Sequence, residues 1–150
     1  MAAWRVRPLE HTADVGYSIE ADSRGELVHG CLAALLAHLG LKAPRFVEAG
    51  AGPGASTGPD SVEHIEVVAD GDAEALVDAL NEVLYLVQDQ DFRPMTCAVQ
   101  WAPGVLTLHL RGRYLASPRP LAAEIKAVTY HGVDVEESGG RWRARWIADV

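Results

Sequence analysis

The chain has 150 residues, enough for one domain with a substantial core, and 49% of them are hydrophobic, which marks a globular chain and excludes a disordered one. Its formal net charge of −8 excludes non-specific attraction to nucleic acid by the overall electrostatic field of the protein. Because no apolar stretch approaches the ~20 residues of a membrane helix and the N-terminus lacks the apolar core of a secretory signal, we expect a cytoplasmic protein without a membrane segment.

The N-terminal part of the chain is predicted to form strands followed by a helix. Residues 4–21 alternate enough to predict one or two strands. Ser23 and Glu26 have the spacing of a capping box, and the apolar residues that follow recur at helical spacing, which predicts a helix over residues 24–39. Gly40 is typical of a helix C-terminus. The two cysteines of the chain, one of them in this helix, are expected to be buried, reduced thiols.

The middle of the chain is predicted to contain a loop, a strand and a second helix. Residues 43–60 are expected to form a mobile surface loop, because Gly, Pro and Ala dominate its centre at 49–59. This loop lacks the glycine fingerprint and the following helix start that a phosphate-binding loop needs. Residues 62–69 alternate as a strand, and Asp72 is expected to cap a helix over residues 73–90.

The C-terminal part of the chain is predicted to consist of strands. The order of elements is therefore strands, helix, strand, helix and a run of strands, which is typical of an α+β fold. We expect a single domain over residues 1–150, with two helices packed on a mainly antiparallel sheet. The predicted C-terminal strands cover residues 95–101, 105–114 and 125–131, followed by a hairpin over 133–150.

The hairpin explains a run of alternating arginine and tryptophan residues near the C-terminus. With Gly139-Gly140 as a two-residue turn, Arg143 faces Glu136 and Arg145 faces Asp134, while the tryptophans of the same strand point toward the core. Basic residues interleaved with aromatic ones can indicate RNA binding, but the opposed carboxylates favour cross-strand ion pairs on a solvated face.

Three carboxylates lie near the two ends of the chain. Asp14 follows the first predicted strand, and Asp149 stands next to the carboxylate of Val150. If the two ends meet, these groups repel one another unless a cation or protons neutralise them, and oxygen-only ligands point to Ca²⁺ or Mg²⁺ rather than Zn²⁺. The alternatives are a turn-capping role for Asp14 and a solvated acid at Asp149.

Three further residues are candidates for supporting roles or partner contacts. His11 is expected either to orient a ligand through a hydrogen bond or to be a half-buried histidine that serves the turn. Lys126 and His131 lie on one extended segment, where Lys126 can also pair with Glu124. Because no catalytic triad, cysteine–histidine pair or zinc-ligand pattern is present, we do not expect an enzyme.

Three blocks of the sequence resemble the archease family. The first is Leu-Glu-His-Thr-Ala-Asp-Val-Gly at residues 9–16, and the second is Leu-Val-Asp-Ala-Leu-Asn-Glu-Val-Leu-Tyr-Leu at residues 76–86. The third is Glu-Ile-Lys-Ala-Val-Thr-Tyr-His at residues 124–131, together with the chain's final Trp-Ile-Ala-Asp-Val at 146–150. The order and spacing of these blocks fit the family over nearly the whole chain.

The resemblance implies a strand-helix-strand-strand module with an insertion, and an accessory role. Archeases promote guanylylation and multiple turnover of an RtcB-type RNA ligase in tRNA splicing or RNA repair, so this ligase is the expected partner and RNA is contacted only indirectly. The family binds a divalent cation, here expected to be Ca²⁺ with Mg²⁺ as the alternative. The matching ligands are Asp14 and Asp149, with the Val150 carboxylate as a further donor, and Lys126 and His131 match signature positions without an assigned role.

Two other functions are compatible with the sequence. One is a chaperone or modulator of a different nucleic-acid-processing enzyme, whose basic surface would face the acidic N-terminal part of this chain. The other is a metal-dependent hydrolase that uses paired carboxylates, although no nucleophile or general base is evident. The sequence leaves the oligomeric state open.

Overall fold

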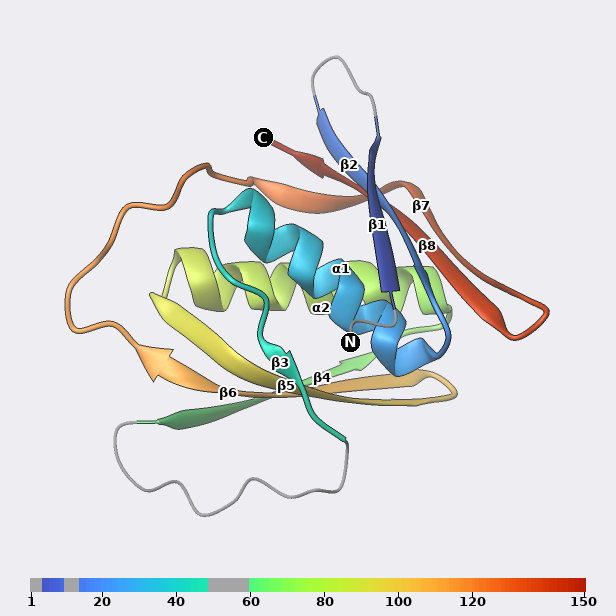
Figure 1. The fold of residues 1–150 in the computed structure, drawn as a ribbon, viewed down its shortest axis with the longest axis horizontal. Helices are drawn as coiled ribbons and strands as arrows, with labels where there is room; N and C mark the ends of the chain where they lie inside the picture. The colour runs from blue at the N-terminus through green and yellow to red at the C-terminus, as the bar shows by residue number, and fades with distance from the viewer. Residues whose placement is uncertain (1–3, 10–13, 49–59) are drawn as a thin grey trace.

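The computed structural model describes residues 4–9, 14–48 and 60–150 of the chain (Figure 1). Eight strands and two helices lie in these ranges. Their order confirms the expected α+β class with two helices and mainly antiparallel strands. The elements are β1 (Trp4–Leu9), β2 (Asp14–Ala21), α1 (Arg24–His38), β3 (Arg45–Phe46), β4 (Ser61–Val68), α2 (Asp72–Gln88), β5 (Phe92–Ala102), β6 (Val105–Tyr114), β7 (Ala127–Ser138) and β8 (Arg141–Asp149).

The strands divide into two sheets of four. Sheet A has the order β1-β2-β8-β7 and is antiparallel throughout. Sheet B has the order β3-β5-β6-β4, and its pairs are antiparallel except for β3 with β5. Sheet A joins the first two strands of the chain to the last two, and this pairing positions the candidate site.

Both helices lie between the two sheets (Figure 1). Helix α1 contacts β1, β2 and β8 of sheet A and β5 of sheet B, while α2 contacts β7 on one side and β4, β5 and β6 on the other. Every residue from Leu27 to Leu36 in α1 is therefore buried, as expected for a helix that is covered on all sides. The buried side chains of both helices and both sheets form one continuous core.

Local signals set the ends of α1 as the sequence predicts. The side chain of Ser23 accepts a hydrogen bond from the backbone N–H of Glu26 at 3.2 Å, which satisfies one of the helix's unpaired donors. At the other end Gly40 adopts a φ of 84°, a conformation that ends helices and that glycine reaches without strain. Cys31 and Cys97 are buried free thiols, as expected, and burial raises the pKa of Cys97 to about 12.

The expected cap of α2 is wrong. Gly71 occupies the N-cap position without a side-chain hydrogen bond, and Asp72 is the first helical residue. The carboxylate of Asp72 instead pairs with the guanidinium of Arg24 at 3.2 Å. Arg24 also lies against Trp101 of sheet B and Trp142 of sheet A, with its Cζ 4.5 Å and 5.3 Å from the two ring centroids. The carboxylate is therefore used to hold an arginine between the two sheets rather than to cap the helix.

The predicted loop at 43–60 is only partly described. Arg45 and Phe46 form the short strand β3, which pairs in parallel with β5 and which the sequence analysis did not anticipate. Residues 49–59, where mobility was expected, lie outside the described part of the chain.

The C-terminal hairpin has the predicted turn and register. Gly139 and Gly140 both have positive φ, and Asp134 and Glu136 pair with Arg145 and Arg143. The regular pairing of β7 with β8 extends from the turn only as far as Asp134, because the register of the two strands shifts between Asp134 and Thr129. The segment between them forms a bulge.

Gly112 is a point at which two strands approach too closely for a side chain. A Cβ atom at this position would clash with the backbone oxygen of Arg93 and lie 2.8 Å from Cα of Pro94, neither of which can rotate away. Gly112→Ala is therefore expected to lower the free energy of unfolding by about 2–3 kcal/mol in urea denaturation.

Gly25→Ala is the matched control. Gly25 lies in the first turn of α1, and its nearest neighbour is the partly exposed, movable ring of Phe46. Because alanine favours the helix over glycine, this variant is expected to keep or raise stability. Equal losses in the two variants would contradict the steric explanation.

Candidate functional site

Strands β2 and β8 place Asp14 directly opposite Asp149. The two residues are the first of eight register partners in this antiparallel pair. Side chains of directly opposed residues project from the same face with Cβ atoms about 4.5–5.5 Å apart. Asp14 is half-buried and Asp149 is exposed. In Figure 1 the C-terminus lies at the end of sheet A where β2 begins, so the two acids mark one corner of the molecule.

Val150 follows the last residue of β8 and is exposed. It therefore brings further oxygen atoms to the corner that Asp14 and Asp149 occupy. In the ranges that the structure describes, no group of three or more His, Cys, Asp or Glu side chains is arranged to hold a metal ion. The aspartate pair would consequently need donors of another kind, such as oxygens of Val150 or water, to complete a coordination sphere.

The donor set at this corner suits a hard cation. Carboxylate and main-chain oxygens are the ligands that Ca²⁺ and Mg²⁺ prefer, whereas structural zinc sites use nitrogen and sulfur. Two carboxylates held opposite each other also repel, and a bound cation would remove that repulsion. The residues present therefore fit the hard cation that the sequence predicts.

Lys126 lies next to the aspartate pair through the main chain. Its backbone N–H donates a hydrogen bond to the carbonyl of Asp149 at 2.8 Å, and Ala127 is the register partner of Asp149. Its side chain is exposed and borders a groove between α2 and the segment that leads into β7. The structure thus brings Lys126 to the same corner as Asp14.

Two amide side chains of α2 hold this segment in place. Asn81 donates to the carbonyl of Val128 at 2.9 Å and accepts from its N–H at 2.8 Å. Gln88 makes the same pair of bonds to Ile125, at 2.8 and 2.9 Å. The two amides therefore bind backbone N–H and carbonyl groups at the edge of sheet A that another strand would otherwise bind. Neither amide is a candidate on the sequence alone, where the one signal is their separation of seven residues, which places them on one face of a helix.

His131 lies apart from this corner, inside the bulge of β7. The bulge contains Gly132, whose φ is 73°, and the carbonyl of His131 accepts a hydrogen bond from the Thr129 side chain at 3.3 Å. The neighbouring Tyr130 donates its hydroxyl to Asp78 of α2, and that bond raises the pKa of Tyr130. The bulge therefore displays His131 on the surface rather than directing it to the aspartate pair. His11 lies outside the described residues.

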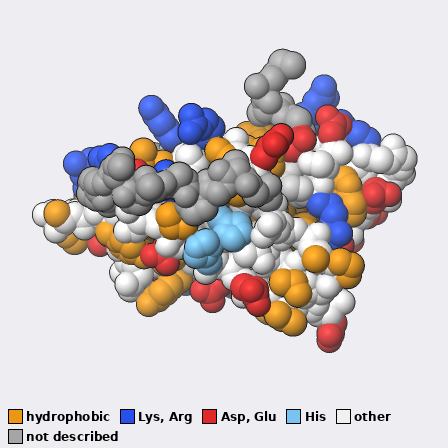
Figure 2. Space-filling model, turned by 90° about the horizontal axis from the view of Figure 1, so that it is seen from below, with side chains coloured by type: hydrophobic (Ala, Val, Ile, Leu, Met, Phe, Trp, Pro, Cys, Tyr) orange, Lys and Arg blue, Asp and Glu red, His pale blue; other side chains and the backbone are white. Residues whose placement is uncertain are grey.

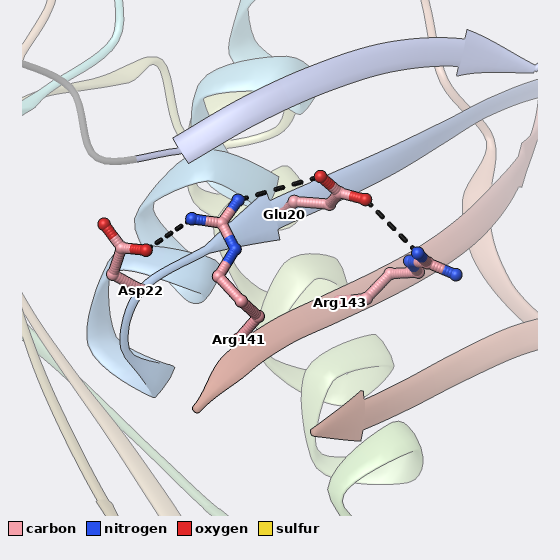
Figure 3. A network of polar contacts seen from close by, with 4 residues as sticks. All are labelled: Glu20, Asp22, Arg141 and Arg143. Atoms are coloured by element: carbon pink, nitrogen blue, oxygen red, sulfur yellow. Dashed lines mark hydrogen bonds and ion pairs between the residues drawn. The ribbon is translucent and has the colours of Figure 1, made fainter. Parts of the chain in front are cut away.

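The arginine-rich hairpin forms ion pairs, as predicted for Arg143, which contacts Glu136 at 3.5 Å. Arg143 also contacts Glu20 at 3.3 Å, and Arg141 contacts both Glu20 and Asp22 (Figure 3). Arg145 and Asp134 are register partners, as predicted, but no ion pair joins these two described residues. On the opposite face of the strand the side chain of Trp146 is fully buried, and that of Trp142 is half-buried. Paired arginines and inward-facing indoles leave this surface poorly suited to stacking or backbone contacts with nucleic acid.

Comparison with known proteins gives a consistent result. The chain matches the Archease protein family (MTH1598/TM1083) over residues 7–150. It is 29% identical to protein archease of Methanopyrus kandleri, an alignment that covers 95% of this chain and 96% of that protein. Neither α1 nor α2, the helices of the described chain, has the length and apolar character needed to cross a membrane.

Two solved structures share the fold. One is an archease from Thermotoga maritima, described as a possible chaperone, with a TM-score of 0.60, 21% identity and coverage of 96% of both chains. The other is protein 1598 of Methanobacterium thermoautotrophicum, with a TM-score of 0.61, 18% identity and coverage of 100% of both chains.

Proposed function

The chain belongs to the archease family, and from that premise we propose that it is a metal-binding accessory protein that promotes guanylylation and multiple turnover of an RtcB-type RNA ligase in tRNA splicing or RNA repair. The observation that carries this proposal is the register pairing of Asp14 with Asp149 at one corner of sheet A. In this proposal the protein catalyses no reaction of its own, and it acts on RNA only through the ligase.

The proposed cation site uses the carboxylates of Asp14 and Asp149, with oxygens of Val150 as a further donor. Ca²⁺ is the first choice and Mg²⁺ the second, because Ca²⁺ accepts variable numbers and arrangements of oxygen ligands, whereas Mg²⁺ requires near-ideal octahedral geometry. Bound there, the cation would supply positive charge at the surface that would face the ligase.

The protein's own residues position this surface. The main-chain bond from Lys126 to Asp149 fixes the last residues of β8 against the segment that leads into β7. Asn81 and Gln88 in turn fix that segment against α2. The Lys126 ammonium is exposed and offers a second, cationic contact for an acidic group of the ligase.

A reconstitution experiment tests the proposal. The purified protein is mixed with the ligase of its own cell, GTP and either Ca²⁺ or Mg²⁺, and both the covalent ligase–guanylate adduct and the joined RNA product are measured over time. We expect faster adduct formation and many turnovers per ligase molecule with the protein present, and a single turnover without it. Equal adduct and product in its presence and absence would refute the proposed function.

A second candidate is a chaperone or modulator of a different nucleic-acid-processing enzyme. The observation that favours it is the description of the Thermotoga maritima relative as a possible chaperone. Affinity capture on the intact protein from its own cell separates the two candidates, because recovery of the ligase supports the first and recovery of another such enzyme without the ligase supports the second.

A further inference from the structure

We propose that His64 and His109 form a binding site for a divalent transition-metal ion such as Zn²⁺, separate from the oxygen site at the corner of sheet A. The two histidines are register partners on neighbouring strands, β4 and β6, of sheet B. Their nearest ring nitrogens, Nδ1 of each, are 2.6 Å apart, and the ring centroids are 4.7 Å apart. This inference does not depend on the proposed function.

The histidine pair is open to solvent. His64 is exposed and His109 is half-buried, whereas the neighbouring residues Ile65 and Leu108 point into the core. Figure 2 looks at the molecule from the side of sheet B, and histidine side chains lie together on that surface. An ion can therefore reach the pair without any rearrangement of the fold.

A neighbouring amide fixes which nitrogen of His109 can bind a metal. Nε2 of His109 lies 3.1 Å from Oε1 of Gln100 on β5. An amide oxygen can only accept, so Nε2 of His109 carries the proton and Nδ1 keeps its lone pair, directed at His64. Metal-binding histidines are typically oriented in this way, with the second ring nitrogen bound to a carbonyl or carboxylate.

The same reasoning assigns the proton on His64. In the absence of metal, Nδ1 of His64 must donate to Nδ1 of His109 across the 2.6 Å contact. Metal binding requires the other neutral tautomer of His64, with the proton moved through solvent from Nδ1 to Nε2. No proton is lost overall, and the only hydrogen bond given up is replaced by two metal–nitrogen bonds.

The geometry needs only a small adjustment. Zinc binds imidazole nitrogen at about 2.0–2.1 Å, so two ligands at the tetrahedral angle lie roughly 3.3 Å apart. The two nitrogens must therefore separate by less than about 1 Å, and the rings must turn so that both lone pairs converge on the ion instead of pointing along the line between the nitrogens.

The charges around the pair are mixed. Burial is the main cause that lowers the pKa of His109 below its ordinary value, and this favours the neutral imidazole that can bind a metal. Glu66, exposed two residues further along β4, lies on the same face and adds negative charge, while Arg111, two residues further along β6, lies on that face and adds positive charge. Because no third His, Cys, Asp or Glu of the described residues completes a cluster, the remaining positions would be taken by water or by a partner's donors.

Titration of the intact protein with Zn²⁺ against a chromophoric chelator tests the inference. Each of the variants His64→Gln and His109→Gln is expected to weaken Zn²⁺ binding at least about tenfold, because a two-point chelate becomes a single contact. His131→Gln, which changes an exposed histidine of sheet A, is the matched control and is expected to bind Zn²⁺ as the wild type does. Unchanged Zn²⁺ binding in either single variant, or an equal loss in the control, would overturn the proposal.

Imidazole ¹H–¹⁵N correlation spectra give a second readout that does not depend on comparing variants. On addition of Zn²⁺ the Nδ1 resonances of His64 and His109 should both move, while Nε2 of His109 remains protonated. A shift of only one imidazole, or ligation through Nε2 of His109, would refute the bidentate site. The two histidine variants should still stimulate the ligase, which distinguishes failure of this site from failure of the proposed function.

Discussion

Asp149→Asn is expected to reduce the stimulation of ligase guanylylation at least about tenfold. The substitution preserves the size of the side chain and the β2–β8 register but removes one of the two charges that face each other at the proposed cation site. Loss of one ligating carboxylate should weaken Ca²⁺ binding by at least as much as loss of a group that only orients a ligand, which is typically 10–100-fold. The measurements are calorimetric titration with Ca²⁺ and the rate of adduct formation.

Stability distinguishes a lost ligand from a damaged fold. Asp149 is exposed, and opposed like charges destabilise a strand pair, so Asp149→Asn should keep or raise Tm in a chelating buffer. Asp134→Asn is the matched control, since Asp134 is also an exposed acid of sheet A but stands opposite Arg145 in the register of β7 and β8. If both variants stimulate the ligase as the wild type does, the aspartate pair is not the functional site.

Asp14→Asn is expected to produce the same defect. When two residues act as one unit, the double variant should be little worse than either single variant. Additive losses would instead indicate that the two aspartates act separately and would contradict a shared cation.

Features set by local chemistry could be predicted from the sequence. The start of α1 depends on Ser23 and its end on Gly40, and the last hairpin depends on a turn of two glycines with positive φ. Each signal acts within a few residues, so the chain's other parts have little influence on it. Asp72 shows the limit of this reasoning. The local pattern predicts that its carboxylate caps α2, but the carboxylate forms an ion pair with Arg24, which is distant in the sequence.

The division into two sheets could not be predicted, because it depends on which distant strands pair. Strand β3 has only two residues, and its parallel pairing with β5 leaves no periodic pattern to detect. The bulge of β7 could not be predicted either. Its one local signal is Gly132, a single residue in a stretch that otherwise alternates as a continuous strand. The strongest overlooked signal was α1 itself, because residues 27–36 contain a single polar side chain, His29, which is typical of a helix covered on both sides.

The candidate site was reached through family resemblance more than through chemistry. Asp14 and Asp149 are separated by nearly the whole chain, and on residue type alone a turn cap and a solvated acid were the better explanations. Asn81 and Gln88 were missed because their backbone partners lie 47 and 37 residues away, and amides on a helix usually indicate only a solvated face.

Asn81→Ala is expected to lower the free energy of unfolding by about 2–4 kcal/mol. The substitution leaves the N–H and the carbonyl of Val128 without partners, and each buried unpaired group costs about 1–3 kcal/mol. Val128 is only 3% exposed, so water cannot readily replace the lost bonds. Urea denaturation measures the loss, and Glu82→Ala, at the adjacent exposed position of α2, is the control expected to change little.

Amide hydrogen exchange locates the effect. In Asn81→Ala the N–H of Val128 should lose protection while that of Ile125 keeps it, and in Gln88→Ala the pattern should reverse, because each amide serves one backbone partner. Both variants should also weaken Ca²⁺ binding, since the segment that they anchor carries the Lys126 bond to Asp149. Loss of stability with unchanged Ca²⁺ affinity would show that α2 supports the fold without positioning the aspartate pair.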